Sequence, residues 1–410
     1  MFKSSEDIRA YLSSNPYVVA PMVDHSDYPF RMLARRYGAG LCFSPMINAG
    51  LAEKSPTYLE RIFATGPGDR PLAVQLAGHD PEALLKTAKM IGEAANIIDL
   101  NLGCPQGIAR RGRYGSFLLE EEDLVESIVR HLVENLSVPV SCKIRIFEDR
   151  QRTLRLAQRL EQAGCSLLTV HGRTRFQNKE LVGPADFDII REIKQTLKIP
   201  VIANGSMANF SEVRAALEIT GCDGAMAAEA LLENPALFSG EKIVDLDLLA
   251  KEYLECVDLY PDQHSFVKSH LFKFLYAGFK EHTDLRDRLA KANTLEEYQQ
   301  IAVEMAERRK DVSPEAKLGW YFRYRKDQPQ SLLAKRDQPS CHTEQCEPQG
   351  FKEPNEPKCS NEVKETNELK DSSEPKEMNE LKSIGEKEKI AESQKPSLES
   401  EVKILEKESV

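Results

Sequence analysis

The sequence predicts an α/β protein: a (β/α)8 TIM barrel followed by a small all-helical domain and a disordered acidic C-terminal tail. Eight short apolar or β-branched segments lie between residues 17 and 228, and stretches of helical period separate them. After residue 240 the patterns are helical only. Eight such units over about 225 residues fit a barrel, and a doubly wound sheet with fewer parallel strands is the competing topology.

The eight predicted strands have the length expected of strands in such a sheet. In chain order they cover residues 17–22, 41–46, 71–76, 97–102, 138–144, 167–171, 199–204 and 224–228.

Helices between the strands are indicated by their ends and by apolar stripes. Asp80 stands before Pro81, which places a capping acid ahead of a proline in the first turn. Residues 120–136 and 152–163 each carry apolar side chains along one stripe. Gly164 follows the second of these helices as a C-terminal glycine. The pattern therefore alternates strand and helix throughout the first part of the chain.

The chain divides into three predicted parts. Residues 1–240 form the barrel, and residues 241–336 form the helical domain. Residues 337–410 carry about 19 acidic residues against 11 lysines, so most of the net charge of −10 lies there. This last segment repeats Asn/Ser-Glu-x-Lys every six residues and has almost no aromatic side chains. It cannot bury enough apolar surface to fold, and we expect a disordered spacer whose partner the sequence does not indicate.

Composition excludes several classes of protein. No apolar run approaches the roughly 18 to 20 residues that a bilayer crossing needs, and no leader pattern opens the chain, so we expect no membrane partner. Nine cysteines without a Cys-x-x-Cys pair argue against a disulfide framework or a metal site. A reducing compartment fits, so we expect the protein in the cytoplasm or also in the nucleus.

The chemistry of a barrel sits at the carboxyl ends of its strands, where catalytic side chains from different strands meet. Unusual polar residues gather at six of the predicted strand ends. They are Gln75, Asn101, Cys104, Lys143 with Arg145, His171 with Arg173, Asn204 and Glu229.

The segment from Asp99 to Gly115 is the most distinctive of these. A lone cysteine is more often a small buried hydrophobe than a reactive group. Cys104, however, lies between Gly103 and Pro105 on a constrained loop just after a strand. That position lets its thiol face the mouth of the barrel.

With these motifs the sequence resembles the dihydrouridine synthase family of flavin enzymes, which reduce uridines in tRNA. The matching motifs, in order, are Pro21-Met22, Val74-Gln75, Leu100-Asn101-Leu102-Gly103-Cys104-Pro105, Lys143-Ile144-Arg145, His171-Gly172-Arg173-Thr174 and Ala203-Asn204-Gly205. The match is strong over residues 16–240 and weaker to about 325. Residues 104–115 resemble the eukaryotic subfamily that acts on tRNA positions 16 and 17.

The resemblance implies an FMN-dependent enzyme that uses NADPH or NADH and acts on the tRNA D-loop as a monomer. Cys104 would be the general acid that protonates uracil C5 after the flavin delivers hydride to C6. A thiol with a pKa near 8.5 keeps its proton at neutral pH. Lys143 and Arg145 would lower that pKa, so they must point at the flavin and the base instead of the sulfur.

Cofactor contacts are implied by the same resemblance. Lys143 and His171 would contact the flavin, and the Gln75 amide would hydrogen-bond the polar edge of its ring. The residues expected against the ring or its phosphate are Pro21, Met22, Val23, Asn204, Gly205, Ser206, Ala228 and Glu229. Glu229 stands where many members have arginine, so one cation that would contact the phosphate is absent. Arg110 stands where other family members have lysine, so the positive charge is retained but lies on a planar guanidinium.

Contacts with the tRNA substrate are expected from Asn101, Arg145, Arg173, Arg110, Arg323 and Arg325. The last two belong to a basic and aromatic cluster in the helical domain, suited to phosphate contact and base stacking. Its other members are Arg308, Arg309, Lys310, Trp320, Tyr321, Phe322, Tyr324 and Lys326.

Two alternative functions remain at this level. A flavin barrel that reduces a free pyrimidine or enone would not need the helical domain, so truncation near Gly240 would spare its turnover. A non-catalytic tRNA-binding homologue would be colourless when purified. The intact set Gln75, Cys104, Lys143 and His171 argues against the latter.

Overall fold

The computed structural model describes residues 2–178, 181–260 and 264–322. The predicted tail lies outside the described residues. So do Arg323, Tyr324, Arg325 and Lys326 of the predicted RNA-binding cluster. Residues 2–322 belong to one unit by their contacts, and the predicted boundary between residues 240 and 241 stays a prediction.

The predicted barrel is confirmed. Within the described residues, eight parallel strands pair in a ring, because β1 pairs with β9 at one side and β2 pairs with β4 across the remaining gap. The ring consists of β1 (Tyr17–Val19), β2 (Leu41–Phe43), β4 (Leu72–Ala77), β5 (Ile97–Leu102), β6 (Val140–Ile146), β7 (Leu167–Thr174), β8 (Val201–Asn204) and β9 (Gly224–Ala227). A two-residue strand, β3 (Ile47–Asn48), also pairs with β4. Closure of the sheet excludes the doubly wound alternative.

Alternation of side chains along the strands decides what fills the barrel. On β5, Ile97 belongs to the interior cluster, while Ile98 packs against the outer helices. Asp99 and Asn101 therefore point inward, two and four residues further along. The apolar interior residues lie near the amino ends of the strands, and α1 (Ser5–Ser14) packs Ile8 and Leu12 against them. The polar interior residues are left at the carboxyl ends.

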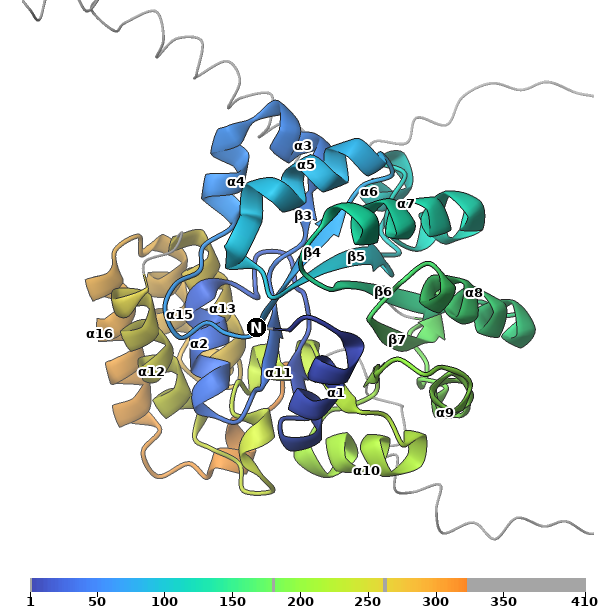
Figure 1. Ribbon diagram of the computed structural model, residues 1–410. Helices are drawn as coiled ribbons and strands as arrows, with labels where there is room; N and C mark the ends of the chain where they lie inside the picture. The colour runs from blue at the N-terminus through green and yellow to red at the C-terminus, as the bar shows by residue number, and fades with distance from the viewer. Residues whose placement is uncertain (1, 179–180, 261–263, 323–410) are drawn as a thin grey trace, which may run out of the picture. The chain divides into compact units, whose positions relative to one another are not determined.

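Helices surround the ring of strands (Figure 1). The predicted cap is confirmed: the Asp80 carboxylate accepts hydrogen bonds from the backbone N–H groups of Glu82 and Ala83. Gly164 has φ +99° just after its helix, as expected of a C-terminal glycine. The longer helices are α2 (Tyr28–Arg36), α5 (Pro81–Ile91), α7 (Glu122–Asn135), α8 (Arg150–Gln162), α9 (Phe187–Thr196) and α10 (Phe210–Thr220). The shorter ones are α3 (Ala49–Lys54), α4 (Pro56–Ile62), α6 (Gly107–Arg111), α11 (Glu229–Glu233), η1 (Gly92–Ala94), η2 (Gly115–Glu120) and η4 (Leu237–Ser239).

From residue 241 to 322 the described chain is helical, as predicted. Its helices are α12 (Leu246–Leu259), α13 (His264–Phe274), α14 (Gly278–Glu281), α15 (Thr283–Lys291), α16 (Leu295–Arg308) and η5 (Pro314–Lys317). They gather beside α2, which α12 contacts directly (Figure 1). The buried Asp27 carboxylate joins the two regions: it accepts from Tyr253 Oη and pairs with His270 Nε2, each at 3.0 Å. None of the described helices is long and apolar enough to cross a membrane.

Candidate active site

Strand register brings the predicted polar residues together at the carboxyl end of the barrel. Gln75 pairs with Asp99 across β4 and β5, and Asp99 pairs with Ser141 across β5 and β6. Further pairs are Asn101 with Lys143, Arg145 with His171, and His171 with Asn204. The interior face of five neighbouring strands is therefore polar at this end.

Cys104 is the partly exposed cysteine of the described residues, and the other five described cysteines are buried. Cys142, for example, belongs to the apolar cluster that the strands form with the outer helices. The loop after β5 is held from both sides. The Cys104 carbonyl accepts from the Ser116 amide at 3.0 Å and from the Ser116 hydroxyl at 2.9 Å, while Arg145 Nε donates to the Gly103 carbonyl at 2.9 Å. The thiol therefore sits on a fixed loop.

Gly115, the first residue of η2, must be glycine because it packs directly against Cys104. Its φ is +67°, and a Cβ placed there would lie 2.6 Å from the Cys104 carbonyl oxygen and 2.9 Å from the Cys104 Cβ. Both of those atoms are rigidly attached to the backbone, so no side-chain rotation could relieve the contact.

The surroundings of Cys104 keep its thiol protonated. Burial raises the pKa of Cys104, while the Gln106 backbone N–H, Arg145 and Lys143 act in the opposite direction without overcoming it. The guanidinium of Arg145 is directed at backbone oxygens: besides Gly103, it donates to the carbonyls of Thr174 at 2.8 Å and Gln177 at 3.1 Å. Its hydrogen bonds thus join the loop after β5 to the end of β7 and the loop that follows it, instead of meeting the sulfur.

A buried hydrogen-bonded chain leads to this loop. Ser141 Oγ donates to Asp99 Oδ1 at 2.6 Å, and Gln75 Nε2 donates to Asp99 Oδ2 at 2.7 Å. Asn101 Nδ2 donates to Gln75 Oε1 at 2.8 Å. Burial raises the pKa of Asp99 to about 6. The sequence does not single out Asp99 as a site residue. Its position two residues before Asn101 on a strand was the available signal, because it puts both side chains on one face.

Lys143 and His171 lie next to each other inside the mouth. Lys143 Nζ donates to Asn204 Oδ1 at 2.9 Å, and burial together with Arg145 lowers the pKa of Lys143 to about 8. Burial and the three neighbouring cations lower the pKa of His171 well below its usual value. Arg173 Nη1 lies 3.2 Å from His171 Nε2, so that nitrogen accepts and the imidazole is neutral.

The loop after β8 turns through two residues with positive φ, Gly205 at +113° and Ser206 at +53°. Ser206 Oγ accepts from Arg173 Nη2 and from the Ala185 backbone N–H, each at 2.8 Å. The guanidinium of Arg173 is thus fixed beside the predicted phosphate loop. Ala228 and Glu229 lie where β9 ends and α11 begins.

The remaining predicted residues lie at the rim. Pro21 and Met22 are partly buried in the loop after β1, and Val23 is exposed. Arg110 is exposed on the short helix α6.

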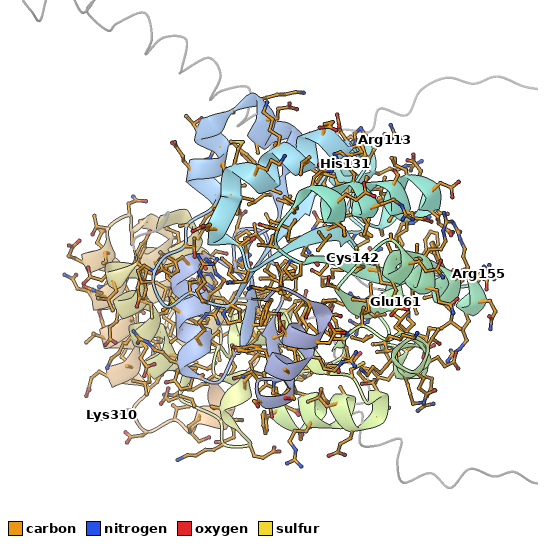
Figure 2. The ribbon with its side chains drawn as sticks, in the orientation of Figure 1. Arg113, His131, Cys142, Arg155, Glu161 and Lys310 are labelled. Carbon is orange, nitrogen blue, oxygen red and sulfur yellow. The ribbon has the colours of Figure 1, made fainter. Side chains whose placement is uncertain are left out.

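The expectation for part of the helical cluster is wrong. Arg309 is 2% exposed and forms a 3.0 Å ion pair with Asp247, so it cannot present its charge to a phosphate. Arg308 pairs with Asp284 and with Glu304. Lys310 stays at the surface, at the edge of the helical region (Figure 2). The acidic partners of Arg308 and Arg309 come from other helices or from one turn away on the same helix. A cluster of basic residues in the sequence does not reveal these partners.

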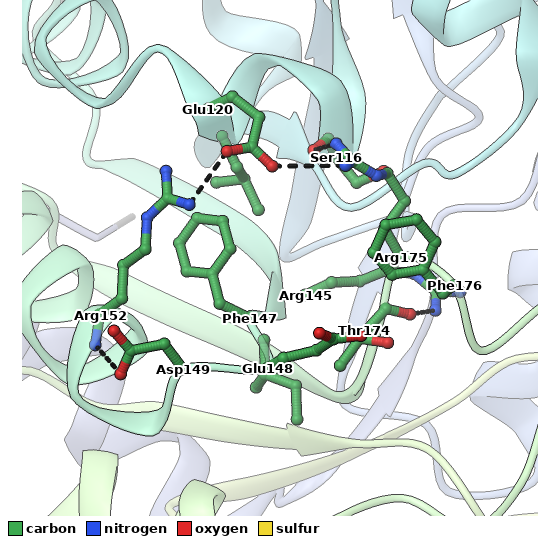
Figure 3. Close-up of a pocket in the computed structure, with 12 residues that line it drawn as sticks. Ser116, Glu120, Arg145, Phe147, Glu148, Asp149, Arg152, Thr174, Arg175 and Phe176 are labelled. Atoms are coloured by element: carbon green, nitrogen blue, oxygen red, sulfur yellow. Dashed lines mark hydrogen bonds and ion pairs between the residues drawn. The ribbon is translucent and has the colours of Figure 1, made fainter. Parts of the chain in front are cut away.

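Sequence reasoning also missed a cavity of about 170 Å³ beside the Cys104 loop (Figure 3). Arg175 lines this cavity and contacts two aromatic rings, with its guanidinium carbon 4.9 Å from the centre of the Phe117 ring and 5.0 Å from that of Phe176. Glu120 pairs with Arg175 at 3.3 Å. No cluster of three or more metal-ligating side chains occurs in the part of the chain that the structure describes.

Comparison with known proteins identifies relatives of the chain. The family described as dihydrouridine synthase (Dus) matches residues 18–318. The "tRNA-dihydrouridine(16/17) synthase [NAD(P)(+)]-like" protein of Rattus norvegicus is 45% identical over 282 residues, which cover 68% of this chain and 64% of the relative. The "tRNA-dihydrouridine(16/17) synthase [NAD(P)(+)]" of Schizosaccharomyces pombe is 41% identical over 297 residues, 69% of this chain and 74% of that protein. The chain therefore spans slightly less than two thirds of the rat relative.

Proposed function

The chain belongs to the dihydrouridine synthase family, and we propose that it is an FMN-dependent tRNA-dihydrouridine synthase. Its reaction is the reduction of the C5–C6 double bond of D-loop uridines at positions 16 and 17, with NADPH or NADH as reductant. The names of the rat and Schizosaccharomyces pombe relatives support the reaction, the positions and the nicotinamide. The observation that carries the proposal is a protonated thiol on a fixed loop at the mouth of a barrel lined by polar side chains.

The interior residues fit an FMN group. Lys143 has three donors, and its one hydrogen bond among the described contacts goes to Asn204. Its pKa is lowered by burial and by the nearby Arg145 cation, which the charge of Asp99 offsets only in part, and the anionic ring of a reduced flavin would add the negative charge that Lys143 lacks. Bound FMN, reduced by the nicotinamide, supplies a hydride for uracil C6. In this proposal Gln75 on β4 and His171 on β7 contact the ring from strands on either side of Lys143.

The phosphate of FMN belongs, in this proposal, at the loops after β8 and β9, with Asn204, Gly205, Ser206, Ala228 and Glu229. Glu229 stands where many family members have arginine. Arg173 offers a replacement cation, because its guanidinium already lies on the Ser206 hydroxyl. Backbone N–H groups of the Gly205–Ser206 turn complete the anion site.

Cys104 is the proton donor in this mechanism. Its thiol holds a proton at neutral pH and releases it to C5 as negative charge develops there. The bonds from Ser116 and Arg145 fix the loop, so the sulfur keeps its place while the base enters. The target uridine must be turned out of the folded tRNA to reach it.

The tRNA is the partner of this reaction. We assign part of its binding to residues 241–336, including Arg323 and Arg325, with Asn101, Arg110, Arg145 and Arg173 at the barrel mouth. Action as a monomer in the cytoplasm, or also in the nucleus, and a spacer role for residues 337–410 are parts of the same proposal.

The test uses Cys104→Ala with Cys222→Ala as its matched control, because Cys222 is a buried cysteine just before the amino end of β9. Cys104→Ala should keep the bound yellow flavin and NADPH oxidation yet lose most dihydrouridine formation, as mapped by mass spectrometry of tRNA. Cys222→Ala should retain all three. Undiminished dihydrouridine in Cys104→Ala would refute the assigned proton donor, and a colourless wild-type protein without product would refute the enzyme.

A further inference from the structure

The chain of hydrogen bonds beneath the Cys104 loop has a direction. At its upper end, the backbone N–H groups of Gly103 and Cys104 both donate to Asn101 Oδ1, each at 3.1 Å. A backbone N–H can only donate, so this end requires the oxygen of the Asn101 amide. The Asn101 nitrogen is then turned toward Gln75, where it donates to Oε1.

The lower end has the same direction for an independent reason. With its oxygen engaged by Asn101, Gln75 turns its nitrogen toward position 99, and an acceptor must stand there. Asp99 is fully buried on β5, and an ionised carboxylate is an acceptor only. Its second oxygen accepts from Ser141. Both ends of the chain therefore impose one orientation on two side-chain amides that could otherwise turn by half a rotation.

We propose that Asp99 is a positioning residue whose carboxylate fixes the orientation of the Gln75 and Asn101 amides and thereby holds the loop that carries the Cys104 thiol. The inference rests on the proposed function only in so far as Cys104 is the proton donor. Asp99 acts through its neighbours and does not reach the reacting atoms.

The groups facing Asp99 favour the ionised form that this role needs. Lys143 supplies a positive charge from β6, and the Gln75 and Ser141 hydrogen bonds lower the pKa of Asp99, although burial outweighs them. The resulting pKa of about 6 leaves the carboxylate predominant at pH 7 and above.

Asp99→Asn changes this acceptor with almost no change in shape. The new amide can present its oxygen to Gln75, which replaces a charge-assisted hydrogen bond by a weaker neutral one, while the Ser141 hydroxyl turns to accept from the new nitrogen. It can instead present its nitrogen to Gln75. The N–H groups of residues 75 and 99 then face each other, unless the amides of Gln75 and Asn101 both turn over. Either arrangement weakens the hold on the amides of Gly103 and Cys104.

Gln75→Glu combined with Asp99→Asn restores the direction. The substituted amide at position 99 would accept from Ser141 and donate to the new carboxylate at position 75, which accepts from Asn101. The double variant keeps one buried carboxylate among these side chains and the same number of hydrogen bonds. It therefore separates the effect of amide orientation from a simple loss of packing.

The experiment measures hydrogen exchange at the amides of residues 103 and 104, with dihydrouridine formation as a second readout, on the full-length protein. In Asp99→Asn these amides should exchange about tenfold faster, corresponding to about 1.4 kcal/mol, and dihydrouridine formation should fall by a similar factor. The double variant should recover most of the protection against exchange. Exchange is its only readout, because Gln75 also contacts the flavin in the proposed function. Ser141→Ala is the control for a lost buried bond, and it should keep the protection at residues 103 and 104 because Asp99 still accepts from Gln75.

Unchanged exchange in Asp99→Asn would overturn the proposal, as would a double variant that protects residues 103 and 104 no better than the single one. If Asp99→Asn does not fold, the double variant must fold and protect both amides, and its failure to do so is also a refutation. A wild-type protein that forms no dihydrouridine would refute the proposed function, while the exchange measurement would still decide the role of Asp99.

Discussion

Replacing Gly115 with alanine tests the link between backbone geometry and the Cys104 loop. A Cβ at this position would lie 2.6 Å from the Cys104 carbonyl oxygen, far inside contact distance. The backbone φ of +67° adds about 1 to 2 kcal/mol for any L-residue. Because the loop must move, the two Ser116 bonds to the Cys104 carbonyl are lost as well, at about 0.5 to 1.5 kcal/mol each. We expect a total loss of about 2 to 5 kcal/mol in the free energy of unfolding, summed from these terms.

Gly221→Ala is the matched control. Gly221 has nearly the same φ, +64°, but a Cβ there would meet nothing within 4 Å. It should therefore lose only the conformational part, about 1 to 2 kcal/mol. Urea unfolding of both variants gives the difference, and dihydrouridine formation by the folded protein shows whether the thiol has moved. Equal destabilisation by the two substitutions, with full activity in Gly115→Ala, would refute the account of the loop.

Two other predictions concern charge. Since the pKa of Lys143 is about 8, its cation is lost as pH rises through that value, so flavin affinity measured by fluorescence should fall between pH 7 and pH 9. Lys143→Arg should bind flavin with little pH dependence over that range, and a wild-type affinity that stays flat would contradict the role of Lys143. Arg309→Met leaves the buried Asp247 with Lys317 as its remaining cation and should lower the free energy of unfolding by about 1 to 3 kcal/mol. The tRNA affinity of the folded variant should not change. A marked loss of tRNA affinity in a filter-binding assay would show that Arg309 contacts the RNA.

Much of the fold and part of the site follow from local pattern. The period of two along a strand puts Asp99 and Asn101 on one face, and likewise Lys143 and Arg145, wherever the strand lies. Eight such strands alternating with capped helices are sufficient to predict a barrel, and the barrel in turn predicts that its polar strand ends meet. The glycine and proline that flank Cys104 mark a loop before any coordinate is known.

Contacts between distant positions were decided by the tertiary structure alone. Arg145 was expected at the barrel mouth, but the sequence does not show that its guanidinium joins the carbonyls of Gly103, Thr174 and Gln177 there. Arg309 was expected at the surface and lies in a buried ion pair with Asp247. Charge and residue type belong to the sequence, whereas the partner that satisfies each charge depends on which strands and helices become neighbours. A long polar side chain has many possible partners, and only the closed barrel with its packed helices selects among them.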